Sequence, residues 1–332
     1  MHTFVIAEAG INHNGSLQTA KKLADAAKTA QVDCIKFQTF VPENLVTGTA
    51  EMAEYQKENV GKSSSQLRML QELALSFDEF RELKKYCDEI GLLFVSTPFD
   101  FDSINFLDSL GLPFWKIPSG EITNFPYLRM IAKTRKPVVL STGMSTLAEI
   151  EEAVNVLERY GSQNISLLHC TTEYPAPIEE INLKAIKMMN ERFGVPTGYS
   201  DHTQGILAPI IAVGVGAVII EKHFTLDKHM KGPDHKASLE PEELTEMVKQ
   251  IRKAEKMLSG TGIKERMPSE EKNMAVARKS IVAKVEIKKG EVFTEDNLTT
   301  KRPGTGLNPM KWENVIGQKA KKDFKVDEFI DI

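Results

Sequence analysis

A dense group of polar residues lies between residues 216 and 238, in the stretch GAVIIEKHFTLDKHMKGPDHKAS. A run of apolar residues stops there at Glu221, and three histidines follow, which are His223, His229 and His235. Histidine and carboxylate side chains are the groups that bind divalent metals and transfer protons near neutral pH. This part of the chain is therefore a candidate metal or acid–base site, and a solvated surface is the simpler alternative.

His202 and His223 are the histidines that we predict to bind a metal. Each closes an apolar run, and the two runs follow one another along the chain. Imidazoles at the ends of neighbouring strands can share one divalent cation and leave positions open for substrate and water. His229 and His235 lie instead in the polar loop KHMKGPDH, where we expect solvated side chains outside the metal's ligand set.

Lysines and hydroxyl groups form a second candidate set. Lys36, Lys116 and Lys222 end apolar runs, where an ammonium group needs a partner because an unpaired buried charge is costly. Together with the hydroxyl groups of Thr97, Ser119, Ser141 and Thr142, and with the Gly-containing turn PSGE, they could hold an anion. This pattern predicts a phosphorylated or carboxylated substrate.

Carboxylates near these runs are the candidate acids and bases. They are Glu8, Glu121, Glu221 and Asp234. Each could instead pair with a lysine, and Glu221 is the strongest case for that because Lys222 follows it. Asn12 and His13 follow the first apolar run and could also line the site.

The elements that must position these groups follow from hydrophobic periodicity. Short apolar runs alternate with amphipathic helical patterns such as those at 17–30, 77–90 and 147–160. The apolar runs cover residues 4–7, 34–37, 92–97, 114–117, 137–142, 165–170, 195–200 and 217–223. Eight strands that alternate with helices predict a (β/α)8 barrel. A doubly wound open sheet is the rival fold, but no GxGxxG follows the first run.

Polar side chains close every one of the eight predicted strands. They are Glu8, Lys36 with Gln38, Thr97, Lys116, Ser141, His169, Ser200 with His202, and Glu221 with His223. The carboxyl ends of the strands in a barrel meet on one face, where barrel enzymes place their active sites. We therefore expect these side chains to converge at the mouth of the barrel.

Composition and domain organisation exclude several classes of protein. The chain has 332 residues, a formal net charge of −4 and three widely spaced cysteines. These features predict no nucleic-acid partner and no disulfide framework. Without a signal-like segment or a membrane span, they indicate a cytoplasmic protein. We expect a catalytic barrel at 1–260, a polar linker at 261–277 and a small, mostly β domain at 278–332 that docks against something because of its size.

The motifs together resemble the sialic acid synthase family. In the barrel they are IAEAGINHNG, IKFQTF, STPFD, WKIPSGE, STGM, HCTTEYP, YSDHTQG, IEKHFTLDK and GPDHKAS; in the tail they are KSIVA, IKKGE and TKRPGTG. The tail resembles that family's antifreeze-like (SAF) domain. The resemblance implies an enzyme that condenses phosphoenolpyruvate (PEP) with an N-acetylated hexosamine, and a homodimer in which the small domain is swapped onto the partner's barrel.

The resemblance also implies a role for particular residues of this chain. Mn²⁺ (or Mg²⁺) would be bound by His202 and His223, and PEP by Lys36, Thr97, Lys116, Ser119 and Ser141. The sugar would face Glu8, Gln38, Tyr174 and Asp234, with Arg302 reaching the sugar's N-acetyl group in the partner's site. Glu8, Glu121 and Lys116 would take part in catalysis, with Glu8, Glu121 or the metal delivering the water.

Two questions stay open on the sequence. Thr171, in HCTTEYP, stands where the sialic acid synthase pattern has Asn, and this resembles synthases of legionaminic acid. The sugar is therefore N-acetylmannosamine or 2,4-diacetamido-2,4,6-trideoxymannose. The other question is the reaction itself. A metal-independent aldolase that forms a Schiff base between pyruvate and Lys116 or Lys36 is the alternative enzyme, and a carbohydrate-binding protein is the non-catalytic one.

Overall fold

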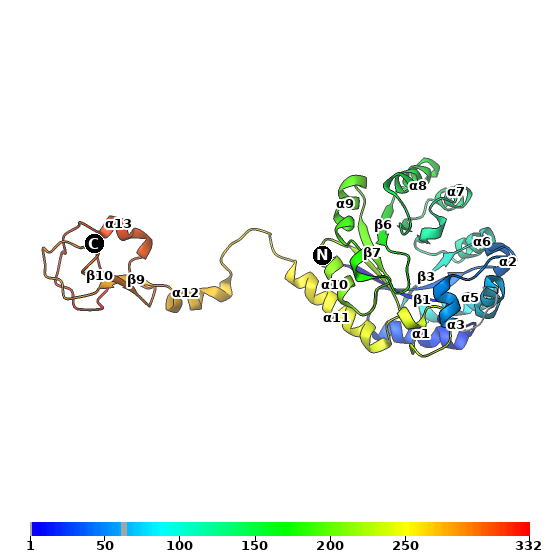
Figure 1. Ribbon diagram of the computed structural model, residues 1–332, viewed down its shortest axis with the longest axis horizontal. Coiled ribbons are helices and arrows are strands. Elements are labelled where there is room, and N and C mark those ends of the chain that lie inside the picture. The colour runs from blue at the N-terminus through cyan, green and yellow to red at the C-terminus, as the bar shows by residue number, and fades with distance from the viewer. Residues whose placement is uncertain (1, 61–64) are drawn as a thin grey trace. The chain divides into compact units, whose positions relative to one another are not determined.

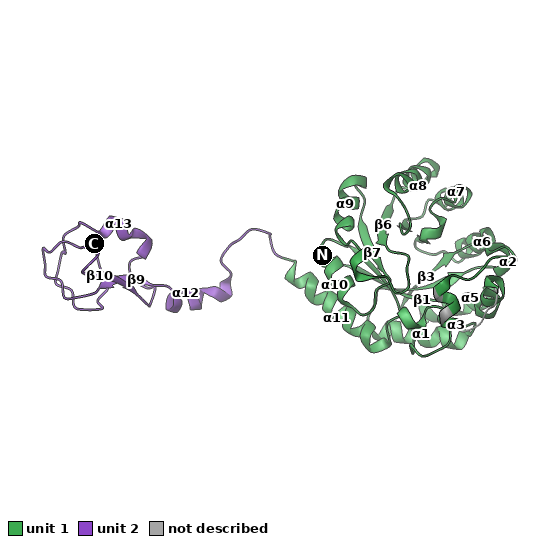
Figure 2. Ribbon diagram, in the orientation of Figure 1, with its two compact units in different colours: residues 1–259 green, residues 260–332 purple. Residues whose placement is uncertain are grey.

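The computed structural model describes residues 2–60 and 65–332. They form two compact units, Met1–Ser259 and Gly260–Ile332 (Figure 2). The first unit contains the predicted strands and helices in alternation, and the second is a small domain with its own apolar core. Within the described part of the chain, every helix is too short or too polar to span a bilayer.

Eight parallel strands form the centre of the first unit, and helices surround them (Figure 1). Along the sheet the order is β3-β2-β1-β8-β7-β6-β5-β4, and β3 and β4 at its two ends lie beside each other. The fold is therefore a (β/α)8 barrel rather than an open doubly wound sheet. The strands are β1 (Phe4–Gly10), β2 (Cys34–Thr39), β3 (Leu93–Pro98), β4 (Trp115–Ile117), β5 (Val138–Ser141), β6 (Ile165–Cys170), β7 (Thr197–Asp201) and β8 (Ile219–His223).

The helices begin where their capping residues predict. The three amphipathic patterns become α1 (Leu17–Thr29), α5 (Phe77–Glu89) and α8 (Leu147–Tyr160), whose N-caps are Ser16, Ser76 and Thr146. Each cap hydroxyl accepts a hydrogen bond from a backbone N–H of the first turn. The others are α2 (Pro42–Leu45), α3 (Glu54–Val60), α4 (Gln66–Leu73), α6 (Phe101–Ser109), α7 (Phe125–Lys133), α9 (Lys184–Phe193), α10 (Leu207–Gly214) and α11 (Pro241–Met257).

Strand alternation sorts the barrel side chains into two sets. Outward residues such as Phe37, Trp115 and Ile220 pack against the helices in the main core cluster. Inward residues fill the barrel with a separate apolar layer, formed by Ile6, Cys34, Val95, Val139, Leu168 and Ile219. This plug layer closes the interior of the barrel, as expected for a packed core. The next inward residue along each strand lies one layer closer to the mouth.

Gly198 is the residue of β7 that lies at the level of the plug layer. A Cβ atom there would lie 2.3 Å from the Ile219 carbonyl oxygen and 2.8 Å from Leu168 Cδ2. Only glycine fits, because the neighbouring backbone cannot move away without disturbing the β7–β8 pairing. The absence of a side chain on this strand lets Leu168 and Ile219 fill the centre of the barrel.

The second unit holds two antiparallel strands, β9 (Ser280–Ala283) and β10 (Leu298–Lys301). Its core includes Ile281, Phe293, Leu298 and Phe324. The stretch expected to be a linker contains the helix α12 (Glu271–Ala277), and α13 (Trp312–Val315) lies later in the unit. Isolated β-bridges add to the β character of this domain.

Replacing Gly198 by alanine tests the packing of the plug layer. The added methyl group meets backbone at less than contact distance, so we expect Gly198→Ala to lower the free energy of unfolding by about 1–3 kcal/mol. Gly214→Ala is the control, because a Cβ at that helical position meets open space. Chemical denaturation of both variants measures the difference. Equal stability of the two would contradict a close-packed plug.

Candidate active site

A cavity of about 300 Å³ opens at the carboxyl ends of the barrel strands. This size suits a small-molecule site. Each strand contributes one side chain from the inward position just above the plug layer, and together they form a polar layer across the cavity. These residues are Glu8, Lys36, Thr97, Lys116, Ser141, Cys170, Ser200 and Glu221.

Two lysines and two glutamates make the polar layer a network of buried charges. Lys36 Nζ lies 2.5 Å from Glu8 Oε2 and 3.8 Å from Glu221 Oε1. Lys116 Nζ lies 3.5 Å from the same Glu221 oxygen, and Ser200 donates a hydrogen bond to it. Because these four groups are almost wholly buried, their charges depend on one another rather than on water.

The pKa values in this network follow from burial and from these pairs. Burial raises the pKa of Glu8 to about 7, and Lys36 offsets only part of that effect. Burial alone would also raise the pKa of Glu221, but Lys116 and Lys36 hold it below its usual value. Burial lowers the pKa of Lys116, whereas for Lys36 the two glutamates outweigh burial and raise the pKa. Of the two glutamates in this network, Glu8 is thus the one that can gain or lose a proton near neutral pH.

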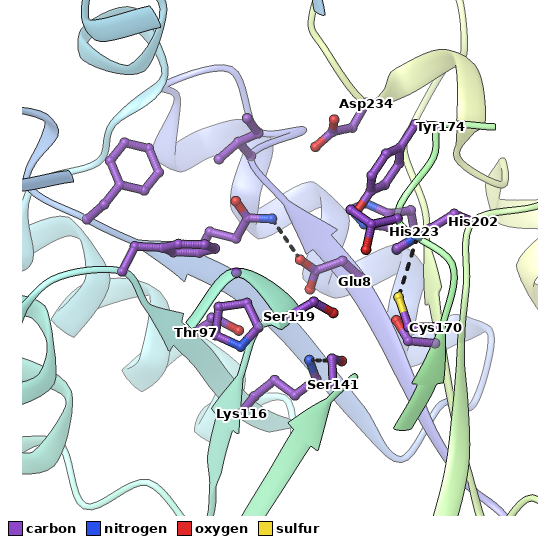
Figure 3. A pocket seen from close by; sticks show the side chains of 18 of the residues that line it. Glu8, Thr97, Lys116, Ser119, Ser141, Cys170, Tyr174, His202, His223 and Asp234 are labelled. Atoms are coloured by element: carbon purple, nitrogen blue, oxygen red, sulfur yellow. Dashed lines mark hydrogen bonds between the residues drawn. The ribbon is translucent and has the colours of Figure 1, made fainter. Parts of the chain in front are cut away.

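The predicted anion-binding residues gather on one side of the cavity (Figure 3). Lys116 Nζ donates to Ser141 Oγ over 2.7 Å, and Lys36 Nζ donates to Thr97 Oγ1 over 3.3 Å. Ser119, in the PSGE turn, accepts a hydrogen bond from the backbone N–H of Gly143 at 2.9 Å. Two buried cations with neighbouring hydroxyl groups are suited to phosphate and carboxylate oxygens.

The sequence reasoning missed Gly143 and Cys170 as parts of this site. A Cβ on Gly143 would lie 2.1 Å from Thr172 Oγ1 and 2.8 Å from Ser119 Oγ, so a side chain there would displace both. Cys170 lines the cavity, with its Sγ 3.8 Å from His202 Nδ1. Gly143 had a sequence signal, because a glycine follows directly after the apolar run 137–142. Cys170 had none, because the sequence does not show which of His169 and Cys170 faces inward.

His202 and His223 lie together on the opposite side of the cavity (Figure 3), with ring centroids 5.5 Å apart. Thr171 O, 2.7 Å from His202 Nδ1, fixes the orientation of that ring. Tyr174 packs on the His202 ring at 4.1 Å between centroids. The His223 Nδ1 atom is buried and, among the residues that the structure describes, has no hydrogen-bond partner.

This donor set fits a divalent metal ion held by two imidazoles. A buried ring nitrogen without a partner is costly, and a cation would satisfy it. In the described ranges no group of three or more His, Cys, Asp or Glu side chains could form a closed metal site. Two protein ligands would leave the remaining positions to substrate and water, the arrangement of catalytic rather than structural sites.

Gln38 and Asp234 also line the cavity, as the sequence predicts for sugar-facing residues. Gln38 Nε2 donates to Glu8 Oε1 over 3.0 Å. Burial raises the pKa of Asp234 to about 6, and Asp234 reaches the cavity from the loop that follows β8 (Figure 3). The amide and the carboxyl group supply the directional hydrogen bonds that a sugar requires.

Two strand-end residues expected at the mouth face the other way. The Lys222 side chain points out of the barrel. Its Nζ atom lies 2.6 Å from Asp201 Oδ2, and both side chains are fully buried. The His169 ring contacts the Ile181 carbonyl oxygen at 2.7 Å and does not line the cavity. The physical reason is the two-residue period of a strand, which puts Lys222 and His169 on the helix side when Glu221 and Cys170 face inward.

The surroundings of four other residues also differ from those expected from the sequence. Asn12 and His13 are buried and make structural hydrogen bonds to Phe224 O and to the Gly15 N–H. His235 is not solvated: it is buried and contacts Thr225 Oγ1 at 2.6 Å. Thr142, predicted to help hold the anion, donates its hydroxyl hydrogen to Leu168 O instead. None of these four residues lines the cavity.

Two further site predictions fall outside the described cavity. Glu121 lies just after β4, is half-buried and accepts a hydrogen bond from Asn124 at 2.6 Å, but it does not line the cavity. Arg302 belongs to the second unit, where its Nε donates to Ala277 O over 2.9 Å. Both stay predictions.

The fold and this arrangement define a (β/α)8-barrel enzyme with a polar, small-molecule site at the carboxyl ends of its strands. Comparison with known proteins agrees. Residues 23–264 match the model of the NeuB family, and residues 278–331 match the SAF domain. The chain belongs to the NeuB family.

Relatives of known name resemble the chain over most of its length. N,N'-diacetyllegionaminic acid synthase of Campylobacter jejuni is 52% identical over 99% of this chain and 98% of the relative. The human N-acetylneuraminate-9-phosphate synthase is 37% identical over 98% of this chain and 91% of the relative. The solved structure of N-acetylneuraminic acid synthetase from Leptospira borgpetersenii has a TM-score of 0.72 and 34% identity, covering 82% of this chain and 90% of that one.

Proposed function

We propose that the chain condenses PEP with an N-acetylated mannosamine and water, giving a nine-carbon α-keto acid of the sialic acid type and inorganic phosphate. One observation carries the proposal: a cradle for a dianionic ester and a pair of imidazoles share one cavity, with Glu8 between them (Figure 3). Named synthases of sialic and legionaminic acids, at up to 52% identity over nearly the whole chain, support it.

The cradle would hold PEP through Lys36, Thr97, Lys116, Ser119 and Ser141. Its ammonium and hydroxyl groups bind phosphate and carboxylate oxygens, and they stay in place as charge moves onto the departing phosphate. The apolar plug layer beneath them closes the inner end of the site, so that water reaches it only from the mouth of the barrel. Anions that replace water in such a site interact strongly with the two lysines.

His202 and His223 would hold Mn²⁺ (or Mg²⁺), whose chemistry when bound is to polarise the aldehyde of the open-chain sugar. Tyr174, Gln38 and Asp234 would orient the sugar so that its C1 faces C3 of PEP. Attack of C3 on C1 forms the carbon–carbon bond and leaves a cationic centre at C2. Water adds there, and the tetrahedral intermediate expels phosphate with cleavage of the C–O bond.

Glu8 is the residue that we assign to take the proton from the attacking water. It lies in the polar layer, next to the lysines of the cradle, and its pKa of about 7 makes it both a usable base and a usable acid at neutral pH. Glu121 is the other candidate, and its half-buried position outside the cavity makes it the weaker one.

An aldolase that uses a Schiff-base lysine is the second candidate function. The lowered pKa of Lys116 favours it, because a nucleophilic amine must be neutral. Two features oppose it: Lys116 is engaged with Ser141 and Glu221, and an aldolase has no use for the imidazole pair.

An assay of phosphate release from PEP tests the proposed function. With Mn²⁺ and an N-acetylated mannosamine we expect turnover that EDTA abolishes and added Mn²⁺ restores. Pyruvate should not replace PEP, and borohydride in the presence of pyruvate should leave the mass of the protein unchanged. Full activity in EDTA, or a reduced adduct on Lys116, would favour the aldolase instead.

The pH dependence of the rate tests the role of Glu8. Because its pKa is raised to about 7, Glu8 is protonated below that pH and becomes a base above it. We therefore expect kcat/KM to rise as the pH increases through about 7. Glu8→Gln should remove this rise and lower kcat by about 100-fold or more. Glu121→Gln is the matched control and should keep the rise; its loss in that variant would assign the base to Glu121.

We also propose a domain-swapped homodimer, working in the cytoplasm, in which Arg302 contacts the sugar bound in the partner's barrel. The three buried, free cysteines suit a reducing compartment. Arg302 is exposed, which leaves its guanidinium accessible to another chain.

Substitution of Arg302 separates this role from a structural one. Arg302→Ala should raise KM for the sugar about tenfold or more, as expected when a charged hydrogen bond to a substrate is lost, with KM for PEP unchanged. Mixing Arg302→Ala with Glu8→Gln chains should restore part of the activity, because one site of the mixed dimer is then intact. No recovery after subunit exchange would rule out action across the dimer.

A further inference from the structure

One side of the cavity is apolar, and the chemistry described so far does not use it. Six side chains form this apolar wall: Ile11, Phe40, Leu45, Val46, Met69 and Leu70. They belong to an apolar cluster separate from the barrel core. Ile11 follows β1, and the other five come from the segment between β2 and α5.

The position of the wall follows from the order of the strands. The wall lies beyond β1 and β2, whereas the imidazole pair and Tyr174 come from β6 to β8 and the loops that follow them. Most of the anion cradle is on β3 to β5 and the turn after β4. A sugar with its aldehyde at the imidazoles and C1 facing the cradle would have the wall on the side that these two groups leave free, where its far end, C6, can contact it.

The chemistry of the wall decides which C6 group it accepts. A hydroxyl group placed against alkyl and aromatic side chains loses its hydrogen bonds to water without replacement. A methyl group gains from burial. Among the described residues of the β2–α5 segment that line the cavity, the polar ones are the amides Gln56 and Gln66, and none of these described lining residues is a cation that could pair with a phosphate on C6.

The Thr171 side chain is not placed to select between a hydroxyl and a methyl group at C6. Its side chain does not line the cavity, and its hydroxyl group points to Glu180 O at 3.5 Å. Its backbone carbonyl instead contacts His202. The residue whose type suggests the sugar in the sequence motif therefore does not line the cavity in which either sugar would bind.

We propose that the apolar wall selects a 6-deoxy sugar, with a methyl group at C6, and that Leu45 and Val46 determine this specificity. The inference rests on the proposed function and names the sugar: a 2,4-diacetamido-2,4,6-trideoxy-hexose in preference to N-acetylmannosamine. Leu45 and Val46 are the partly buried members of the wall. They can therefore change without opening the core of the domain.

A pair of sugars that differ only at C6 tests the proposal. N-acetylmannosamine and its 6-deoxy analogue share the same N-acetyl group, and phosphate release gives kcat/KM for each. We expect the unsubstituted protein to prefer the 6-deoxy sugar by about tenfold or more, which is the order of the effect of one added hydroxyl group in an apolar pocket. Val46→Thr and Leu45→Asn should reduce this preference several-fold, while KM for PEP stays the same.

Val60→Thr is the matched control. Val60 packs in the same apolar cluster with similar partial burial but does not line the cavity. Its variant should keep the preference of the intact protein, which separates contact with the sugar from loosening of the cluster. Thermal unfolding of all three variants confirms that each is folded at the assay temperature.

The outcomes separate this inference from the function on which it rests. Phosphate release with the same ratio of the two sugars in Val46→Thr, Leu45→Asn and Val60→Thr would overturn the role of the wall alone. An intact protein that prefers N-acetylmannosamine would also overturn it. If no phosphate is released with either of these two sugars or with the diacetamido sugar, the proposed function and the inference are both overturned.

Discussion

Burial of two ammonium and two carboxylate groups in one layer of the barrel is the constraint on which the site depends. Lys36, Lys116, Glu8 and Glu221 share so little water that the charge of each is set by the others. Removing one partner would leave an uncompensated charge, which is far more costly than removing a pair together. The layer therefore works as a unit, and its net charge changes only when an anion or a proton enters.

The arrangement of that layer was largely predictable from the sequence. Each apolar strand ends in a polar residue, and a barrel brings such ends together. What the pattern could not give was the direction of each side chain. The strand ends Glu221-Lys222-His223 and His169-Cys170 each offer neighbouring polar groups, and only the register of the inward plug residues decides which of them enters the cavity. Ile219 and Leu168 point inward, so the residues two positions later, Glu221 and Cys170, do as well.

The apolar wall was beyond sequence reasoning for a different reason. Most of it comes from the segment between β2 and α5, whose short helices α2, α3 and α4 have no fixed position in the barrel repeat. Its leucines and methionines look like those of any amphipathic helix. Their role becomes visible only when Phe40, Met69 and Leu70 are seen to line the same cavity as Glu8.

In the second unit, too, the sequence predicted one part of the structure and missed another. Its β-rich pattern and turn residues predicted a small domain, and the structure gives it an apolar core of its own around Ile281 and Phe324. The helix α12 was not predicted, because its apolar residues, Met274 to Ala277, follow one another instead of marking one helical face, and all of α12 is exposed or partly exposed.

The plug layer has a consequence for the order of events. Because Ile6, Val95, Leu168 and their neighbours close the barrel below the polar layer, every ligand enters and leaves through the mouth. A molecule seated on the lysines lies deeper than one held between the imidazoles and the apolar wall. The outer ligand then blocks the path between the deeper ligand and the mouth. The deeper ligand must therefore bind first and leave last. The depth of the cavity alone would thereby set the order of the binding steps.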